Sequence, residues 1–95
     1  MRKMTKTKER AEYITNRLGE IYEKRKINNE EWIVLPNQVV VHVDIIEKGR
    51  LVIEFADNEE NAKIHMADDG QSYYLDEYTP EEMFEEMLKE IKNEL

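Results

Sequence analysis

The stretch QVVVHVDIIEKGRLVIEFA, residues 38–56, decides the fold, because apolar side chains alternate on both sides of one glycine. Such alternation with a period of two is typical of a half-buried strand. A three-residue loop over 47–49 pairs Val43 with Ile53 and His42 with Glu54, whereas a two-residue turn would pair Val43 with Glu54 and mix the two faces. The sequence therefore predicts a hairpin of strands at about 39–46 and 50–56, with Gly49 in the left-handed conformation that such loops need.

A shorter strand is expected before this hairpin. In WIVLPNQ, residues 32–38, a turn at Pro36 and Asn37 follows a strand at about 32–35. This register places Trp32 opposite Val41 and Val34 opposite Val39, on the core side of the sheet.

A second hairpin is expected after it. In NAKIHMADDGQSYYLD, residues 61–76, an Asp69–Gly70 turn separates strands at about 62–67 and 72–76 and pairs Met66 with Tyr73. The middle of the chain thus predicts an antiparallel meander of four to five strands.

A helix is expected at each end of the chain. Apolar residues at helical spacing predict the first from about 6 to 27, where the asparagines of EKRKINN suit a left-handed cap. The stretch TPEE starts the second, with Thr79 as N-cap, Pro80 at the first helical position and Glu82 closing a capping box, and this acidic amphipathic helix runs from about 80 to 94. The fold class is α+β, with residues 1–95 forming a single domain.

One face of the expected sheet is more apolar than a solvated face should be. Either one helix covers it, or both helices share the other face and this patch contacts a second copy of the chain, forming a homodimer. The patch consists of Ile33, Leu35, Val40, Ile46 and Val52.

Composition narrows the classes of function. The 95 residues include no cysteine, which excludes disulfides and thiolate sites and fits a cytoplasmic location. No apolar run is long enough for a membrane span, so we expect no membrane contact. The serine Ser72 stands alone without a glycine-rich elbow, and no phosphate-binding loop is present, so the sequence predicts a protein that is not an enzyme and has no cofactor.

Three residues could form a metal site, but the sequence contains no known metal-binding motif. His42 and Asp44 share a face at positions i and i+2 of one strand, and His65 on a neighbouring strand could approach them. Neither HExxH nor a calcium loop is present. We therefore expect half-exposed histidines and no metal.

Charge is unevenly divided along the chain. The net charge is −8, yet residues 1–26 hold nine Lys and Arg against four Glu, and residues 27–95 hold five against eighteen Asp and Glu. So acidic a domain repels nucleic acid and attracts basic surfaces. The expected partner is a basic nucleic-acid-binding protein, such as a nucleoid protein, a nuclease or a polymerase. The basic edge of the first helix is expected either to lie over the core with its charges in water or to dock on an acidic surface.

The expected binding residues are acidic side chains of the last helix and of nearby loops. On the helix, one acid every four residues rises by about 6 Å per step, close to two steps of the phosphate rise along one DNA strand. The set consists of Glu82, Glu86, Glu90, Glu59, Glu60, Asp68, Asp69, Asp76 and Glu77.

In architecture and charge, the chain resembles the small acidic phage-encoded inhibitors that imitate DNA. These include anti-CRISPR proteins, uracil-DNA glycosylase inhibitors and inhibitors of the nucleoid protein HU. The resemblance implies a phage protein that occupies the DNA site of a host protein and competes with DNA in the host cytoplasm. Two alternatives stay open: an immunity or antitoxin protein that neutralises one partner, and a small structural or adaptor subunit that assembles through the apolar patch.

Overall fold

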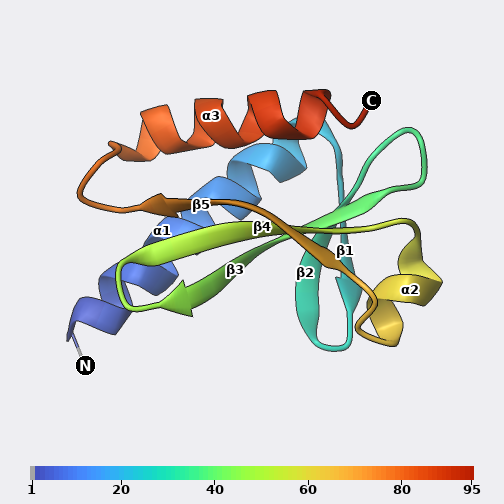
Figure 1. Cartoon of the computed structure of the whole chain (residues 1–95), viewed down its shortest axis with the longest axis horizontal. Coiled ribbons are helices and arrows are strands. Elements are labelled where there is room, and N and C mark those ends of the chain that lie inside the picture. The colour runs from blue at the N-terminus through green and yellow to red at the C-terminus, as the bar shows by residue number, and fades with distance from the viewer. Residues whose placement is uncertain (1) are drawn as a thin grey trace.

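The computed structural model describes residues 2–95, with side chains from Thr5 onward, and confirms the α+β class (Figure 1). An N-terminal helix precedes a five-stranded antiparallel meander, and a helix follows it. The elements in chain order are α1 (Arg2–Ile21), β1 (Glu23–Ile27), β2 (Glu30–Val34), β3 (Val40–Glu47), β4 (Arg50–Ala56), α2 (Glu59–Lys63), β5 (Asp68–Tyr74) and α3 (Pro80–Lys92).

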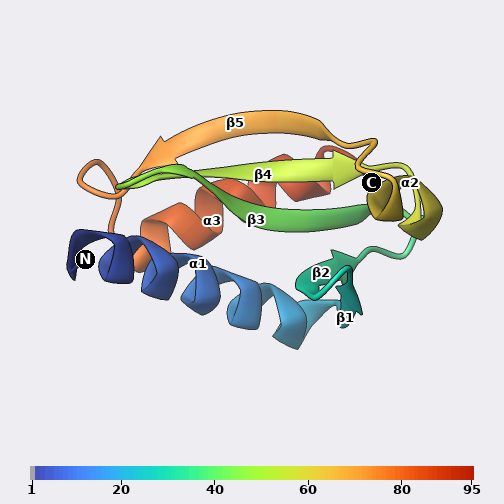
Figure 2. The same cartoon turned by 90° about the horizontal axis from the view of Figure 1, so that it is seen from below.

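The sheet has the strand order β1-β2-β3-β4-β5, and the two long helices share one of its faces (Figure 2). Their apolar sides and that sheet face form the main core, because each element buries its apolar stripe against the others. Its fully buried members include Ile14, Leu18, Val41, Ile53, Met83, Met87 and Ile91. The short helix α2 covers part of the other face, where a second cluster contains Ile27, Trp32, Val40, Ala56 and Ala62.

The expected register of the central hairpin is confirmed. Val43 pairs with Ile53 and His42 pairs with Glu54. The loop is closed differently, because Glu47 pairs with Arg50 around a two-residue turn and the register shifts between Ile45 and Glu47. This bulge keeps the faces in phase despite the shorter turn. Gly49 has a φ of 85°, the left-handed conformation expected for it.

The prediction of one helix over 6–27 is wrong at its C-terminal end. The helix ends at Ile21, and residues 23–27 form edge strand β1, paired with β2. Asn28 and Asn29, with φ values of 53° and 68°, make the two-residue turn that joins the strands. The asparagines are left-handed as expected, but they close a hairpin and not a helix. Only Ile27 of this strand is buried, so no alternation marked it in the sequence.

The expected register between β2 and β3 is wrong by one residue. Ile33, and not Trp32, pairs with Val41, because Gln38 adopts a φ of 78° and lengthens the loop. A one-residue slip exchanges the faces of a strand. Trp32 consequently leaves the main core and stacks on His42 on the opposite face, with the ring centroids 5.0 Å apart.

The expected second hairpin is also wrong. Residues 59–63 form α2, which Asn58 caps by accepting a hydrogen bond from the Asn61 amide, so 62–67 is not a strand. Asp69 and Gly70 lie within β5, which pairs with β4, and not in a turn.

The expected dimer patch does not exist as a surface. Ile33 and Leu35 belong to the main core, and Val40 lies in the second cluster. Val52 is 2% exposed, and only Ile46, at 43%, is open to solvent. The two long helices do share one face, but the monomer itself buries most of the residues on which the dimer was based.

Candidate binding surface

The last helix begins as its sequence predicts. Thr79 accepts a hydrogen bond from the Glu82 amide, and the Glu82 carboxylate accepts one from the Thr79 amide, with Pro80 in the first turn. This reciprocal capping box fixes the direction in which the helix leaves the loop at 75–79. It therefore also fixes the position of the first acidic turn relative to that loop.

Four glutamates line a hollow of about 190 Å³ beside this helix start, together with Tyr78. They are Glu77, Glu82, Glu85 and Glu86. No lysine or arginine is among the lining residues, and among the described side chains these glutamates make one ion pair, between Glu86 and Lys89 on the same helix, where Nζ lies 3.4 Å from the carboxylate. The fold thus brings together three of the predicted residues, Glu77, Glu82 and Glu86, and adds Glu85, which was not in the predicted set.

Glu90 has a structural role that the sequence did not reveal. Its carboxylate accepts hydrogen bonds of 2.8 Å from the Gln71 amide and from the Tyr73 hydroxyl. Burial, and secondarily the hydrogen bond to Glu90, raises the pKa of Tyr73 well above its ordinary value, so the phenol stays a donor. Glu90 joins α3 to β5 and does not extend the acidic row into solvent.

Glu81, absent from the predicted set, links the two long helices. It accepts hydrogen bonds from Arg17 at 2.5 Å and from Tyr13 at 3.0 Å, and the Arg17 guanidinium lies 4.1 Å from the centre of the Phe84 ring. Hydrogen bonds from Arg17 and Tyr13 lower the pKa of Glu81. The basic edge of α1 therefore docks, in part, on the protein's own acidic helix.

The remaining predicted residues are dispersed. Glu59 pairs with Arg25 and Glu60 pairs with Lys63 on α2, at the end of the molecule opposite the loop that leads into α3 (Figure 1). Asp68 and Asp69 are exposed on edge strand β5, and Asp76 is exposed in the loop before α3. The α2 pair therefore does not belong to the same surface as the hollow.

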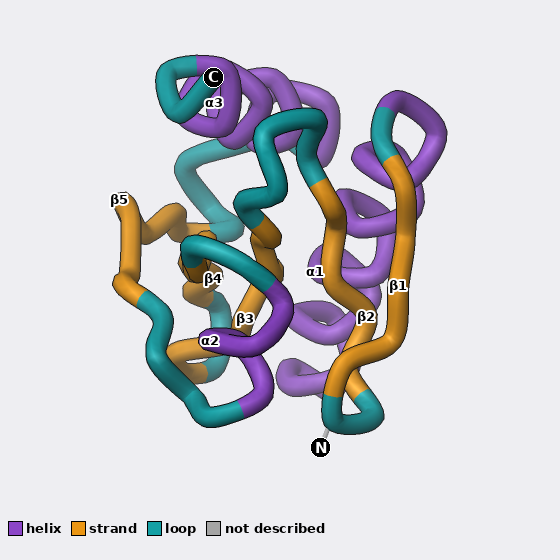
Figure 3. Tube along the Cα trace, turned by 90° about the vertical axis from the view of Figure 1, so that its right-hand side faces the viewer, coloured by secondary structure: helices purple, strands orange, loops and turns teal. Residues whose placement is uncertain are grey.

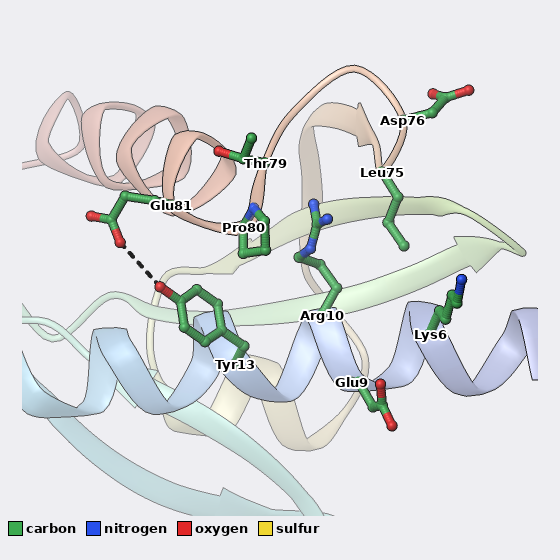
Figure 4. A pocket seen from close by; sticks show the side chains of 9 residues that line it. All are labelled: Lys6, Glu9, Arg10, Tyr13, Leu75, Asp76, Thr79, Pro80 and Glu81. Carbon is green, nitrogen blue, oxygen red and sulfur yellow. Dashed lines mark hydrogen bonds between the residues drawn. The ribbon is translucent and has the colours of Figure 1, made fainter.

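A pocket of about 810 Å³ lies where α1 meets the loop between β5 and α3 (Figure 4). Leu75, Pro80 and Tyr13 supply apolar walls, and Lys6 and Asp76 stand at its edge. Arg10 lines it as well and donates a 3.0 Å hydrogen bond to the Tyr78 carbonyl. Burial lowers the pKa of this guanidinium. The pocket offers apolar contact area next to the acidic loop.

The most basic and the most acidic segments of the chain lie apart in the fold. Helix α1 and strand β1, which carry the basic residues, lie on one side in Figure 3, and β5 lies on the other with α3 above the sheet edge. Residues 68–95 hold ten Asp and Glu against two lysines. Asp68, Asp69, Asp76, Glu77 and Glu85 make no ion pair or hydrogen bond through their side chains within the described part of the chain. We call the exposed acids of 76–86 together with the hollow the β5–α3 acidic surface; Asp68 and Asp69 lie outside it, at the start of β5 near α2 (Figure 1).

One cluster could hold a cation. His42, Asp44 and Glu54 are half-buried on β3 and β4, and their ligand atoms all lie within 4.8 Å of one another. His65 is not part of this group. It is exposed after α2, with a φ of 63°.

No family model, curated protein or solved structure matches the chain. Within residues 2–95, no helix combines the length and the apolar character that a membrane span requires.

Proposed function

We propose that this protein is a non-enzymatic binding protein that docks its β5–α3 acidic surface on a basic DNA-binding protein and competes with DNA for that site. The observation that carries the proposal is the hollow of four glutamates at the start of α3, which has no lining cation. Like charges this close repel each other, which costs stability unless a cation approaches. A surface held in this state is suited to receive cations from elsewhere.

The negative charge of the hollow suggests how a partner would bind. A lysine or arginine side chain of the partner would enter between Glu82 and Glu85 and form charge-assisted hydrogen bonds there. Such contacts increase the association rate and make the affinity dependent on salt. DNA phosphates would bind the same cations, which is the physical basis of competition.

Specificity would come from the neighbouring pocket. Its apolar walls at Leu75 and Pro80 lie close to Asp76, so a partner seated on the acidic loop can insert an apolar side chain there. Interfaces generally combine such an apolar anchor with a polar rim.

The structure changes which residues are suitable for a test. Reversing Glu82 would break the capping box, and reversing Glu90 would remove two internal hydrogen bonds. The double variant Glu77→Lys/Glu85→Lys instead reverses two exposed residues without internal partners. A matched control, Glu12→Lys/Glu30→Lys, makes the same change in net charge at two exposed positions outside this surface.

The experiment is affinity capture from bacterial lysate, with bound proteins identified by mass spectrometry, in the presence and absence of duplex DNA. We expect wild type and control to retain a basic DNA-binding protein that DNA displaces, and the double variant to lose it. A partner that stays bound at saturating DNA would overturn the DNA-competition proposal and favour the immunity or antitoxin alternative. The structural-subunit alternative has lost the exposed patch on which it rested.

A further inference from the structure

We propose that His42, Asp44 and Glu54 form a binding site for a first-row divalent transition metal ion, with Zn²⁺ as its probe. The site is separate from the β5–α3 acidic surface and does not depend on the proposed function. It lies on the sheet face opposite the two long helices, and its three side chains come from the two central strands.

The backbone places the three side chains together. His42 pairs directly with Glu54 across β3 and β4, and Asp44 follows His42 by two residues on the same face. At this site β4 is paired on both sides, and β3 is paired with β4, so the sheet fixes the Cβ positions of the three residues relative to one another. A site on rigid strands needs only side-chain rotation to close on an ion.

The distances suit a shared ion. Nδ1 of His42 lies 3.1 Å from Oε1 of Glu54. Two ligands bound to one zinc ion in tetrahedral geometry at about 2.0–2.1 Å stand roughly 3.3 Å apart. Asp44 completes the group within 4.8 Å, so its carboxylate needs to move by at most about 1.5 Å to reach the same separation.

The imidazole is held in place by its surroundings. The indole of Trp32 stacks on it at 5.0 Å with an angle of 24° between the rings, and the His42 side chain is 12% exposed. The same ring borders a cleft of about 280 Å³ whose lining also includes Lys8, Glu12, Glu30 and Glu31. The ring is therefore reached from solvent through this cleft.

The local charge favours a cation. Asp44 has no ion pair or hydrogen bond through its side chain within residues 5–95, and His42 is the single side-chain partner of Glu54 there. Two carboxylates on one face of the sheet without a lysine or arginine repel each other, and a shared cation removes that repulsion. One nitrogen and two oxygens suit a borderline ion such as Zn²⁺ or Co²⁺, whereas Mg²⁺ and Ca²⁺ favour oxygen alone.

The chain contains a built-in reporter for the test. Trp32 is the one tryptophan, and it touches the proposed ligand. We would treat the protein with a chelator, titrate Zn²⁺ by calorimetry and measure quenching of Trp32 fluorescence by Co²⁺. The proposal predicts one equivalent of bound Zn²⁺, quenching of Trp32 fluorescence when Co²⁺ binds the metal-free protein, recovery of that fluorescence when Zn²⁺ displaces the Co²⁺, and a rise in Tm of about 5 °C or more at a hundredfold excess of Zn²⁺ over its Kd.

Isosteric variants separate ligation from folding. Asp44→Asn and Glu54→Gln keep the side-chain shape, and each should weaken Zn²⁺ binding at least tenfold with an unchanged circular dichroism spectrum. His65→Ala, which removes the other histidine, should bind as the wild type does. Absence of saturable binding at one equivalent, equal affinity of Asp44→Asn, or loss of binding in His65→Ala would each overturn the proposal and leave His42 and Glu54 as a cross-strand hydrogen bond only.

Discussion

Gly70 shows how one residue can be required for a contact made by a distant one. A Cβ at this position would stand 1.9 Å from Oε2 of Glu90, the oxygen that accepts the hydrogen bond from the Gln71 amide. The sequence suggests a turn glycine here, since Asp-Gly is a strong hairpin signal. The actual need is for space, because a carboxylate of α3 reaches down to the backbone of β5.

Gly70→Ala should therefore destabilise the protein through Glu90. We expect a loss of about 1–3 kcal/mol in the free energy of unfolding, because the carboxylate must move and give up its charged hydrogen bonds. In a Glu90→Ala background the same change should cost at least about 1 kcal/mol less, since the clashing atom is gone. Urea unfolding of the four proteins measures this cycle. Equal costs in both backgrounds would contradict the role given to Glu90.

Glu81 makes stability depend on pH in a defined direction. Its pKa is lowered in the folded protein by Arg17 and Tyr13, so the ionised carboxylate stabilises the fold above its unfolded pKa, about 4.3, and this is lost as the pH falls through the lowered pKa. Glu81→Gln should lower the urea midpoint at pH 7 and match the wild type at about pH 2. Glu85→Gln, a neighbour without partners, should not lower the midpoint at either pH value, because it removes only repulsion within the hollow. A deficit of Glu81→Gln that persists at acidic pH would show that the ion pair is not its cause.

At the scale of elements, the sequence predicts helices and strands that carry a regular apolar pattern or a capping motif, and it fails to predict those that carry neither. The alternation around Gly49 predicts the register of β3 and β4, and the capping box at Thr79 predicts where α3 begins. The sequence does not predict strand β1, because four of its five residues are exposed and only Ile27 is buried. The acidic hollow is predicted only in part. It forms because the loop at 75–79 places Glu77 beside the helix, and no local sequence pattern predicts the path of that loop.

The turn of the β1–β2 hairpin gives a test of this element. Asn29 has a φ of 68°, and its turn spans two residues between paired Ile27 and Glu30. Asn29→Ala should lower stability by about 1 kcal/mol, since alanine tolerates left-handed backbone poorly, whereas Asn29→Gly should equal or exceed the wild type. Thermal melts of the two variants decide the matter. Equal melting temperatures would count against a left-handed turn.

At the scale of the whole molecule, the basic first part of the chain and the acidic last part also lie in different places in the fold. Basic α1 and β1 lie on one side and β5 lies on the other, while α3 packs on α1 through the main core and through the contact between Arg17 and Glu81 (Figure 3). A molecule with such polarity is oriented by the field of a charged partner before contact. The orientation that presents the β5–α3 acidic surface to a basic protein also presents the pocket between α1 and the loop before α3.

The most direct test is displacement of a labelled DNA duplex from the captured partner, followed by fluorescence anisotropy as this protein is titrated in. The account predicts complete displacement by wild type and by Glu12→Lys/Glu30→Lys, an affinity that falls as salt is raised, and at least tenfold weaker displacement by Glu77→Lys/Glu85→Lys. A ternary complex, in which the partner holds DNA and this protein together, would contradict it.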